Sequence, residues 1–486
     1  MLFNSYIFIL LFLPLVLVGY YGLYRLKNAT YSKVFLLGMS LWFYAYFNIN
    51  YLFIILGSII LNYIFSQILG KCELKPMYRK GIMIGAIGAN VAIIFYYKYF
   101  DFFISNMNSC FQLDWQLKNL VLPLGISFFT FQQISYIVDS YRYETKDYSL
   151  LDYALFVTFF PQLVAGPIVL HNEMIPQFKD ERNYVLNWDN LSKGIHIFVM
   201  GLTKKVLIAD VLGKAVNWGY TTDTVLTSME VLIISVSYTL QIYFDFSGYC
   251  DMAMGLGKML NIDIPQNFDS PYKATSIPDF WKRWHKTLTR FLTHYIYIPL
   301  GGNRKGKVRQ YINIFIVFLI SGIWHGANWT FIIWGILHGV FNIVNRIFMK
   351  TWERLHIVTR WLFTFLFVNI TWIIFRADTV SQAFMMIRRL LGCENQSISL
   401  ELPSVYKGVE FEFLEDILHL PSLDSIVPPF YMMLYIFGGI LICLNCKNNQ
   451  EREFKPTAVS AVSTIFLFVY CIFSLAGVST FLYFNF

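Results

Sequence analysis

Apolar runs of roughly membrane-spanning length recur from one end of the chain to the other, and they restrict its fold more than any other feature. A helix needs about 20 apolar residues to cross the hydrocarbon core, so the shorter runs are expected to be re-entrant or buried within a bundle. We therefore predict an all-α integral membrane protein with about 11–13 tilted or re-entrant membrane segments. The candidate segments are residues 5–24, 34–48, 50–70, 81–100, 121–138, 151–165, 193–211, 229–249, 310–323, 329–349, 358–376, 430–446 and 458–483.

The composition agrees with a protein that is embedded in a lipid bilayer along its whole length. Of its 486 residues, 56% are hydrophobic and 14% are charged, whereas a soluble domain has about 25% charged residues. We expect one polytopic domain, with N-terminal helices in 1–120, a catalytic core in 121–349 and C-terminal helices in 350–486. The run 5–24 lacks a basic leading region and a small-residue cleavage site, so it is interpreted as a spanning helix rather than a signal peptide.

Charged residues predict how the chain is oriented in the membrane. Lys and Arg collect after the first and third apolar runs and again in 447–455, and such clusters are typical of cytoplasmic loops. Both termini are then expected outside, as is the acidic segment 393–428. The net charge of +8 fits this loop bias, and it gives no reason to expect nucleic-acid binding.

Residues 266–309 are both basic and aromatic, which suits neither a lipid-facing helix nor a plain linker. Nine Lys or Arg residues lie between Lys273 and Arg309, interleaved with Trp and Tyr. One interpretation is a cytoplasmic loop that follows the positive-inside bias. The other is a surface that binds the phosphates of a nucleotide-bearing donor such as coenzyme A. For this second interpretation the candidate phosphate ligands are Lys282, Arg283, Arg304 and Lys305.

One histidine, His325, stands in the apolar sequence SGIWHGANW (321–329). An ionisable residue at membrane depth is costly and is usually functional. Gly322 and Gly326 flank it and permit a break in the helix, which membrane proteins tolerate where the break lines a cavity. His325 is therefore a candidate general base toward a hydroxyl group. The alternative is a core histidine that is hydrogen-bonded to a backbone carbonyl.

Two further histidines are expected to support His325. His338 follows thirteen residues later, about 140° around a continuous helix, so it is interpreted as a packing or supporting residue. His285 lies among cations in KRWHKT, which favour the neutral imidazole, and it is a candidate base or polar partner.

Several other polar or aromatic residues within apolar sequence are candidates for a substrate or tunnel lining. Intramembrane acids and amides usually face a bundle interior, although Asp245 is equally explained as a support for the Gly-rich stretch behind it. The sequence has no HxxxH, HExxH or GxSxG pattern, and its one CxxC lacks partner ligands, so no metal and no permanently bound cofactor is expected. The candidates are Trp324, Trp284, Asp245, Asn328, His338 and Gln133.

Five ordered blocks carry a family resemblance. They are FFPQLVAGPI (159–168), YFDFSGYCDMAMGLGKMLNIDIPQNFDSPY (243–272), FWKRWHKTL (280–288), YIYIPLGGNRKG (295–306) and SGIWHGANWTFIIWGILHG (321–339). These blocks resemble the membrane-bound O-acyltransferase (MBOAT) family, in particular the bacterial branch that contains alginate and peptidoglycan O-acetyltransferase membrane subunits. One position departs from the alginate type, since Thr293 and His294 stand where an Arg-Asp pair is common.

The resemblance implies a fold, a reaction and partners. The fold is a ring of tilted helices around a central tunnel, in the cytoplasmic membrane of a bacterium. His325 matches the essential histidine of the family and His285 its second polar position. The donor would be acetyl-CoA from the cytoplasm, and the acceptor a glycan hydroxyl, reached through a separate extracytoplasmic SGNH-type partner.

Three alternatives stay open at the level of sequence. A transporter or flippase for a lipid-linked glycan would have a similar composition, although transporters often contain inverted repeats and none is found here. An O-acyltransferase that uses a donor other than an acetyl thioester is the second alternative. A passive scaffold, in which His325 is dispensable, is the third.

Overall fold

The computed structural model of the chain describes residues 1–70, 74–145, 148–222, 225–392, 396–407, 426–449, 451, 454–475 and 481–482. In these ranges every regular element is a helix, so the predicted all-α class is confirmed. The chain divides into two compact units. Unit 1 comprises Met1–Phe198 and Cys250–Gln266, and unit 2 comprises Val199–Tyr249 and Asn267–Leu482.

Seven helical stretches of the described residues are long and apolar enough to cross a membrane. This confirms a multi-pass membrane protein, while the side of the membrane on which each terminus lies stays a prediction. Apolar side chains such as Phe363 and Phe437 are exposed on these helices, as a lipid-facing surface requires. The seven stretches are Ile49–Leu69, Pro76–Phe111, Ser228–Met259, Gly306–His325, Trp329–Ile347, Ile357–Arg376 and Val427–Asn445.

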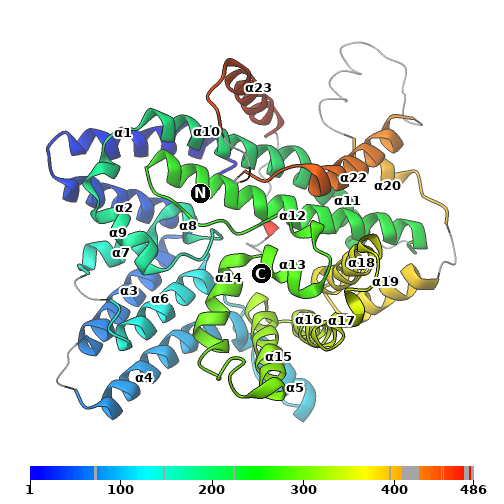
Figure 1. Cartoon of the computed structure of the whole chain (residues 1–486), viewed down its shortest axis with the longest axis horizontal. Coiled ribbons are helices and arrows are strands. Elements are labelled where there is room, and N and C mark those ends of the chain that lie inside the picture. The colour runs from blue at the N-terminus through cyan, green and yellow to red at the C-terminus, as the bar shows by residue number, and fades with distance from the viewer. Residues whose placement is uncertain are drawn as a thin grey trace. The chain divides into compact units, whose positions relative to one another are not determined.

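Unit 1 contains the first ten α-helices, drawn from blue to green in Figure 1. Its short π and 3₁₀ turns are Phe8–Phe12, Phe95–Tyr99 and Glu181–Tyr184. The α-helices are α1 (Leu13–Tyr24), α2 (Ala29–Ala45), α3 (Ile49–Leu69), α4 (Pro76–Ile94), α5 (Phe100–Phe111), α6 (Ile126–Tyr141), α7 (Leu150–Thr158), α8 (Phe160–Leu163), α9 (His171–Lys179) and α10 (Trp188–Thr203), whose last turn passes into unit 2.

Buried amides join α3, α4 and α6 in unit 1. Asn62 and Asn90 exchange amide hydrogen bonds of 3.1 and 2.7 Å. Ser58 donates to Oε1 of Gln133 at 2.6 Å, and Asn62 donates to the same oxygen. Amide groups satisfy one another in this way where no water is present. Gln133, a candidate for the tunnel lining, is thus engaged in helix packing within unit 1.

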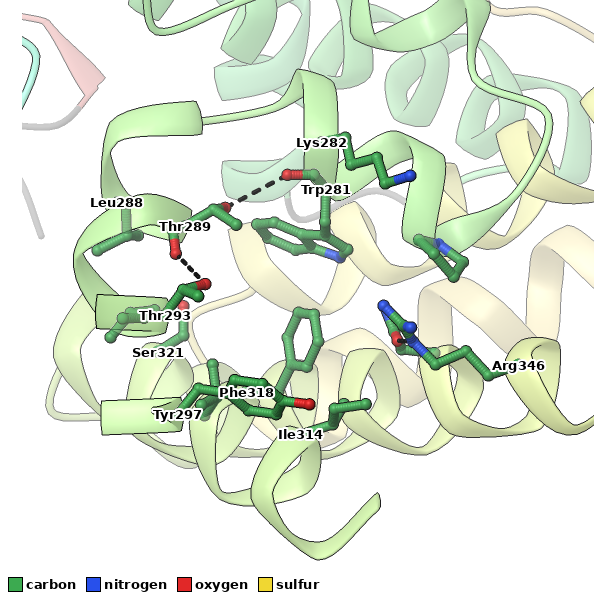
Figure 2. A pocket seen from close by; sticks show the side chains of 14 residues that line it. Trp281, Lys282, Leu288, Thr289, Thr293, Tyr297, Ile314, Phe318, Ser321 and Arg346 are labelled. Carbon is green, nitrogen blue, oxygen red and sulfur yellow. Dashed lines mark hydrogen bonds between the residues drawn. The ribbon is translucent and has the colours of Figure 1, made fainter. Parts of the chain in front are cut away.

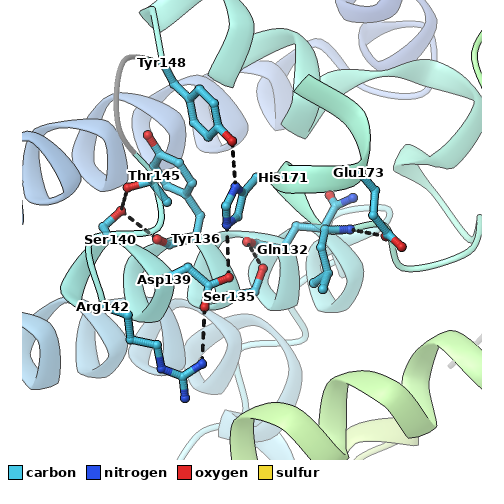
Figure 3. A network of polar contacts seen from close by, with 11 residues as sticks. Gln132, Ser135, Tyr136, Asp139, Ser140, Arg142, Thr145, Tyr148, His171 and Glu173 are labelled. Atoms are coloured by element: carbon cyan, nitrogen blue, oxygen red, sulfur yellow. Dashed lines mark hydrogen bonds and ion pairs between the residues drawn. The ribbon is translucent and has the colours of Figure 1, made fainter. Parts of the chain in front are cut away.

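A second polar network lies where α6 ends and α9 begins (Figure 3). The ring of His171 stands between two partners, with Nε2 3.0 Å from Oδ2 of Asp139 and Nδ1 3.3 Å from the hydroxyl of Tyr148. Arg142 lies 3.5 Å from the other carboxylate oxygen of Asp139. Asp139 and His171 are buried. The network therefore ties the end of α6 to the segment that follows FFPQLVAGPI (159–168).

Unit 2 contains the other helices of the described residues, drawn from green to dark red in Figure 1. Its π and 3₁₀ turns are η4 (Lys204–Ala209), Pro271–Lys273 and η6 (Thr293–Tyr297). The α-helices are α11 (Asp210–Thr221), α12 (Ser228–Met259, whose end passes into unit 1), α13 (Ile277–Arg283), α14 (Lys286–Leu292), α15 (Gly306–His325), α16 (Trp329–Ile347), α17 (Met349–Trp352), α18 (Ile357–Arg376), α19 (Val380–Gly392), α20 (Glu401–Ser404), α22 (Val427–Asn445) and α23 (Ala458–Ser474).

A buried ion pair anchors α12 in unit 2. The ammonium group of Lys205 lies 2.7 Å from Asp245 and 2.8 Å from Asp210. The second oxygen of Asp245 accepts the backbone N–H of Leu482 at 3.0 Å, and the ring of Phe481 lies 4.6 Å from the Lys205 ammonium. Asp245 is therefore fully engaged in holding η4 and the segment 481–482, which agrees with the supporting interpretation of this residue.

One predicted segment differs from the observed helices for an identifiable reason. The run 151–165 was expected as one span, but α7 ends at Thr158 and α8 begins at Phe160. Pro161 lacks an N–H and its ring would clash with the carbonyl of Val157, which disfavours a continuous helix across this position. In the acidic segment expected outside, residues 393–395 and 408–425 lie beyond the described ranges, and Glu401 opens the short helix α20.

Candidate active site

The helical hairpin of α15 and α16 places His325 at the end of a helix. Residue Gly326 has an extended backbone with φ −171°, so α15 ends at His325, and α16 begins at Trp329. The break expected at this glycine is therefore present. Asn328 caps α16, because its side chain accepts the N–H of Thr330 at 3.1 Å and donates to a backbone carbonyl at 2.8 Å. Asn328 thus has a capping role, and it shapes the turn that follows His325.

Aromatic rings surround the imidazole of His325, which is 4% exposed. Trp334 meets it edge to face, with 5.1 Å between ring centroids, and Phe375 does the same at 5.2 Å. The neighbouring indole of Trp324 lies 5.0 Å away. These rings exclude bulk water from the imidazole, a setting in which a proton transfer or a reactive ester is protected from solvent.

A tight bend between α13 and α14 buries His285 completely. The residue adopts the left-handed conformation, with φ 46° and ψ 52°, which is uncommon outside glycine and is strained. Its Nδ1 lies 3.0 Å from Oδ1 of Asn267. Burial lowers the pKa of His285 to about 3, so the ring is neutral at every physiological pH, as the sequence suggested, although burial and not the neighbouring cations is the cause.

The two candidate histidines meet at one tryptophan. The indole of Trp324 lies 6.2 Å from the ring of His285 and 5.0 Å from the ring of His325, and both contacts are edge to face. Residues 40 positions apart in sequence are thereby brought into contact with the same side chain. This pairing makes the region around Trp324 the candidate active site of unit 2.

His338 takes part in packing rather than facing a cavity. The indole N–H of Trp281 donates to Nδ1 of His338 at 3.1 Å, and Nε2 lies 3.1 Å from the hydroxyl of Thr371. That hydroxyl donates to the carbonyl of Val368, so Nε2 of His338 carries the proton and donates to Thr371. Both nitrogens have partners, which supports the predicted supporting role. Trp284 is likewise buried among aromatic rings, 4.9 Å from Phe268.

A cavity of about 270 Å³ lies between α13, α14, η6, α15 and α16. Its lining includes Trp281, the hydrogen-bond partner of His338. Figure 2 shows Trp281 and Lys282 above it, Tyr297 and Ile314 below it and Arg346 at one side. The lining is mostly apolar, and it includes Ser321, which precedes His325 by one helical turn. An apolar cavity with a few polar groups is the usual form of a small-molecule site.

The four basic residues proposed for donor phosphates have different positions. Lys282 lines the cavity, whereas Arg283 is engaged by Asp279 at 3.0 Å and by the carbonyl of Asp269. Arg304 and Lys305 are exposed in the turn before α15 and do not line the cavity. Arg346 of α16 does line it, and sequence reasoning missed this residue, although an arginine near the end of an apolar run was a usable signal.

Comparison with known proteins identifies the fold and the chemistry. The family model of membrane-bound O-acyltransferases matches residues 102–380, a range that contains every residue of the candidate active site. The chain belongs to the membrane-bound O-acyltransferase family. It is therefore an O-acyltransferase enzyme, and the transporter and scaffold alternatives give way to an enzymatic activity.

Curated relatives match between half of the chain and its whole length. The chain is 41% identical to the peptidoglycan O-acetyltransferase of Helicobacter pylori, with 100% of this chain and 98% of that protein covered. It is 38% identical to the probable alginate O-acetylase AlgI of Pseudomonas putida, covering 79% of each chain. A more distant relative is the teichoic acid D-alanyltransferase of Bacillus subtilis, at 29% identity over 50% of this chain and 63% of that protein.

Proposed function

We propose that this acyltransferase moves an acetyl group from cytoplasmic acetyl-CoA toward hydroxyl groups of an extracytoplasmic cell-wall or exopolysaccharide glycan. Two of the relatives described above carry peptidoglycan and alginate in their names. Both of these polymers bear hydroxyl groups. We further propose that a separate carrier passes the acetyl group to the polymer outside the membrane. We place an extracytoplasmic SGNH-type transferase in that role.

The observation that carries the proposal is the meeting of His285 and His325 at Trp324, beside a cavity that reaches Ser321. Acyl transfer needs a proton acceptor next to the attacking hydroxyl and a site that holds the donor in the same geometry. A buried imidazole at the end of α15 provides the first. The adjoining cavity provides room for the second.

In the proposed reaction His325 is the general base. The acceptor hydroxyl attacks the thioester carbonyl, and His325 takes the hydroxyl proton as the new C–O bond forms. The tetrahedral intermediate then expels the thiolate of coenzyme A, which receives the proton from His325. Base catalysis of this kind contributes about 10²–10⁴-fold to a rate, and holding the two substrates together supplies much of the remainder.

The donor phosphates are assigned to the charged side of the cavity. Lys282 and Arg346 line it, and cations pair with phosphate oxygens through charge-assisted hydrogen bonds. The start of α15 and the end of α16 lie at the same end of their antiparallel hairpin, and basic residues collect there: Arg304, Lys305, Lys307, Arg309, Arg346 and Lys350. Such a cluster is typical of the cytoplasmic face, where acetyl-CoA is available.

The test is thioester consumption by purified protein in lipid vesicles. With acetyl-CoA that carries a labelled acetyl group, the proposal requires release of the free thiol together with transfer of the label to an added glycan or SGNH protein. A panel of other acyl thioesters tests the choice of donor. Thiol release that stays at the level of protein-free vesicles for every donor and acceptor would refute the proposal.

A further inference from the structure

The side chain of Asn267 makes several hydrogen bonds with the bend that carries His285. Asn267 is fully buried. Its Oδ1 atom lies 3.0 Å from Nδ1 of His285, 3.2 Å from the backbone nitrogen of Thr287 and 3.0 Å from the hydroxyl of Thr287. Because a backbone N–H can only donate, the amide atom that faces it must be the oxygen. The orientation of the Asn267 amide is therefore fixed by the backbone.

This orientation determines the tautomer of His285. The amide oxygen can only accept a hydrogen bond, so Nδ1 of His285 must carry the proton. In a neutral imidazole the other nitrogen, Nε2, then carries a lone pair and is an acceptor. Burial keeps the ring neutral, which leaves the Nδ1–H form as the single state that satisfies Asn267.

The backbone around Asn267 holds the same bend in place. The N–H of Lys286 donates to the carbonyl of Asn267 at 2.9 Å, and the N–H of Asp269 donates to the carbonyl of Arg283 at 2.9 Å. These bonds cross-link 267–269 to 283–286 on either side of His285. A strained left-handed residue persists only where its surroundings determine its conformation, and this cross-link provides that determination.

We propose that Asn267 is a positioning residue, which fixes His285 as the Nδ1–H tautomer and thereby makes Nε2 a permanent hydrogen-bond acceptor in the acyl-transfer site. This inference rests on the proposed acyl transfer at the site where His285 and His325 meet. A ring that resists protonation orients a hydroxyl or thiol proton rather than carrying it away. The division of work follows: His285 aligns the reacting group through Nε2, and His325 takes its proton.

The tautomer itself is measurable without turnover. Nitrogen chemical shifts distinguish Nδ1–H from Nε2–H imidazole, and protein labelled at histidine, in lipid nanodiscs, gives the spectrum. The His285 signal is assigned as the one that disappears in His285→Asn. We expect wild-type His285 to be in the Nδ1–H form. A wild-type His285 in the Nε2–H form would overturn the proposal, whatever happens to activity.

Three variants connect the tautomer to the rate. Asn267→Ala removes the acceptor, and we expect a mixed tautomer and a kcat lowered by more than about tenfold, with the KM for acetyl-CoA changed less than about twofold. Asn267→Asp keeps an acceptor oxygen and should restore the Nδ1–H form and much of the rate. Thr287→Val, the matched control, removes one hydroxyl bond to Asn267 and should leave the tautomer unchanged.

The outcomes separate this inference from the proposed function. An Asn267→Ala protein that keeps the Nδ1–H form, or that keeps the wild-type rate with a mixed tautomer, contradicts the positioning role. Wild-type acetyl transfer by His285→Ala contradicts the positioning role as well. Absence of thiol release by the wild-type protein refutes the proposed function instead, and leaves the tautomer measurement to stand on its own.

Discussion

Gly322 of α15 and Gly335 of α16 face each other so closely that a methyl group on either would lie 3.0 Å from the Cα atom of the other. Small residues let helix backbones approach in this way in membrane proteins. The approach occurs one turn before His325 on α15 and one residue after Trp334 on α16. The distance between the two backbones therefore determines how Trp334 packs against the imidazole.

The first prediction concerns this helix contact. Gly335→Ala would place a methyl group 2.6 Å from the carbonyl oxygen of Phe318, so α15 and α16 must move apart. We expect a destabilisation of about 1–3 kcal/mol and a lower kcat, because the rings around His325 lose contact. Thermal unfolding in detergent and acetyl transfer measure the two effects.

A matched glycine provides the control. Among the described residues, no atom lies within 4 Å of a methyl group added at Gly438 of α22, so Gly438→Ala should change neither stability nor rate appreciably. If Gly335→Ala and Gly438→Ala lowered stability and rate equally, the close contact between α15 and α16 would not be the cause of the effect.

The second prediction concerns the structural role of Asp245. Asp245→Asn leaves the buried ammonium of Lys205 without its most buried counter-charge, and breaking one side of a buried ion pair costs about 3–5 kcal/mol. Asp210 pairs with the same lysine but is 23% exposed, compared with 2% for Asp245. Asp210→Asn should therefore be milder. Thermal unfolding measures the destabilisation that each variant causes. Equal destabilisation by the two variants would contradict the greater structural weight of Asp245.

The third prediction follows from the low pKa of His285. The folded protein keeps this ring neutral to about pH 3, whereas in the unfolded chain it takes up a proton below its ordinary pKa of about 6.5. The unfolded state then binds more protons, so stability falls as the pH drops from about 6.5 toward 3, by up to about 1.4 kcal/mol per pH unit. Above pH 7 the contribution is constant.

His285→Asn tests this linkage, because asparagine tolerates the left-handed backbone. Chemical unfolding at a series of pH values should show a smaller loss of stability on the acid side for this variant than for the wild type. His356 is exposed and caps α18, so His356→Asn is the matched control, which removes a histidine that is not buried. Identical slopes for all three proteins would contradict the buried neutral imidazole.

The fourth prediction addresses the donor. Lys282→Ala and Arg346→Ala should each raise the KM for acetyl-CoA by several-fold with little change in kcat, because they remove charge that binds phosphate but does not contact the reacting carbonyl. Lys305→Ala, which removes an exposed charge outside the cavity lining, is the comparison. A larger effect at Lys305 than at Lys282 would move the phosphate site out of the cavity.

The sequence predicted the helical class and the break at Gly326 without a structure. It also singled out His325 and His285, whose roles stay predictions. Periodicity and length suffice for helices, and an isolated histidine in apolar sequence is conspicuous. The relation between His325 and His338 was beyond this reasoning. On one continuous helix the two histidines would lie on different faces. The helix instead ends between them, and both rings contact Trp334, with 5.1 Å between ring centroids for His325 and 4.8 Å for His338.

The individual roles of the basic residues could not be read from the sequence either. Positive-inside bias and phosphate binding predict the same composition, so Lys282, Arg283, Arg304 and Lys305 were equivalent in the sequence. Only the fold distinguishes a cation that lines a cavity from one engaged by Asp279 or exposed in a turn. The same holds for Asn267, whose distance of 18 residues from His285 hides a direct hydrogen bond.

Transfer of labelled acetyl groups by the His325→Ala protein tests the central claim most directly. Wild-type protein and the variant are reconstituted at equal amounts, with unfolding curves to confirm that both are folded, and are given acetyl-CoA and the acceptor. The account predicts that His325→Ala loses at least about 10²-fold in rate while its folding and membrane level stay unchanged. Acetyl transfer at the wild-type rate by His325→Ala would contradict it.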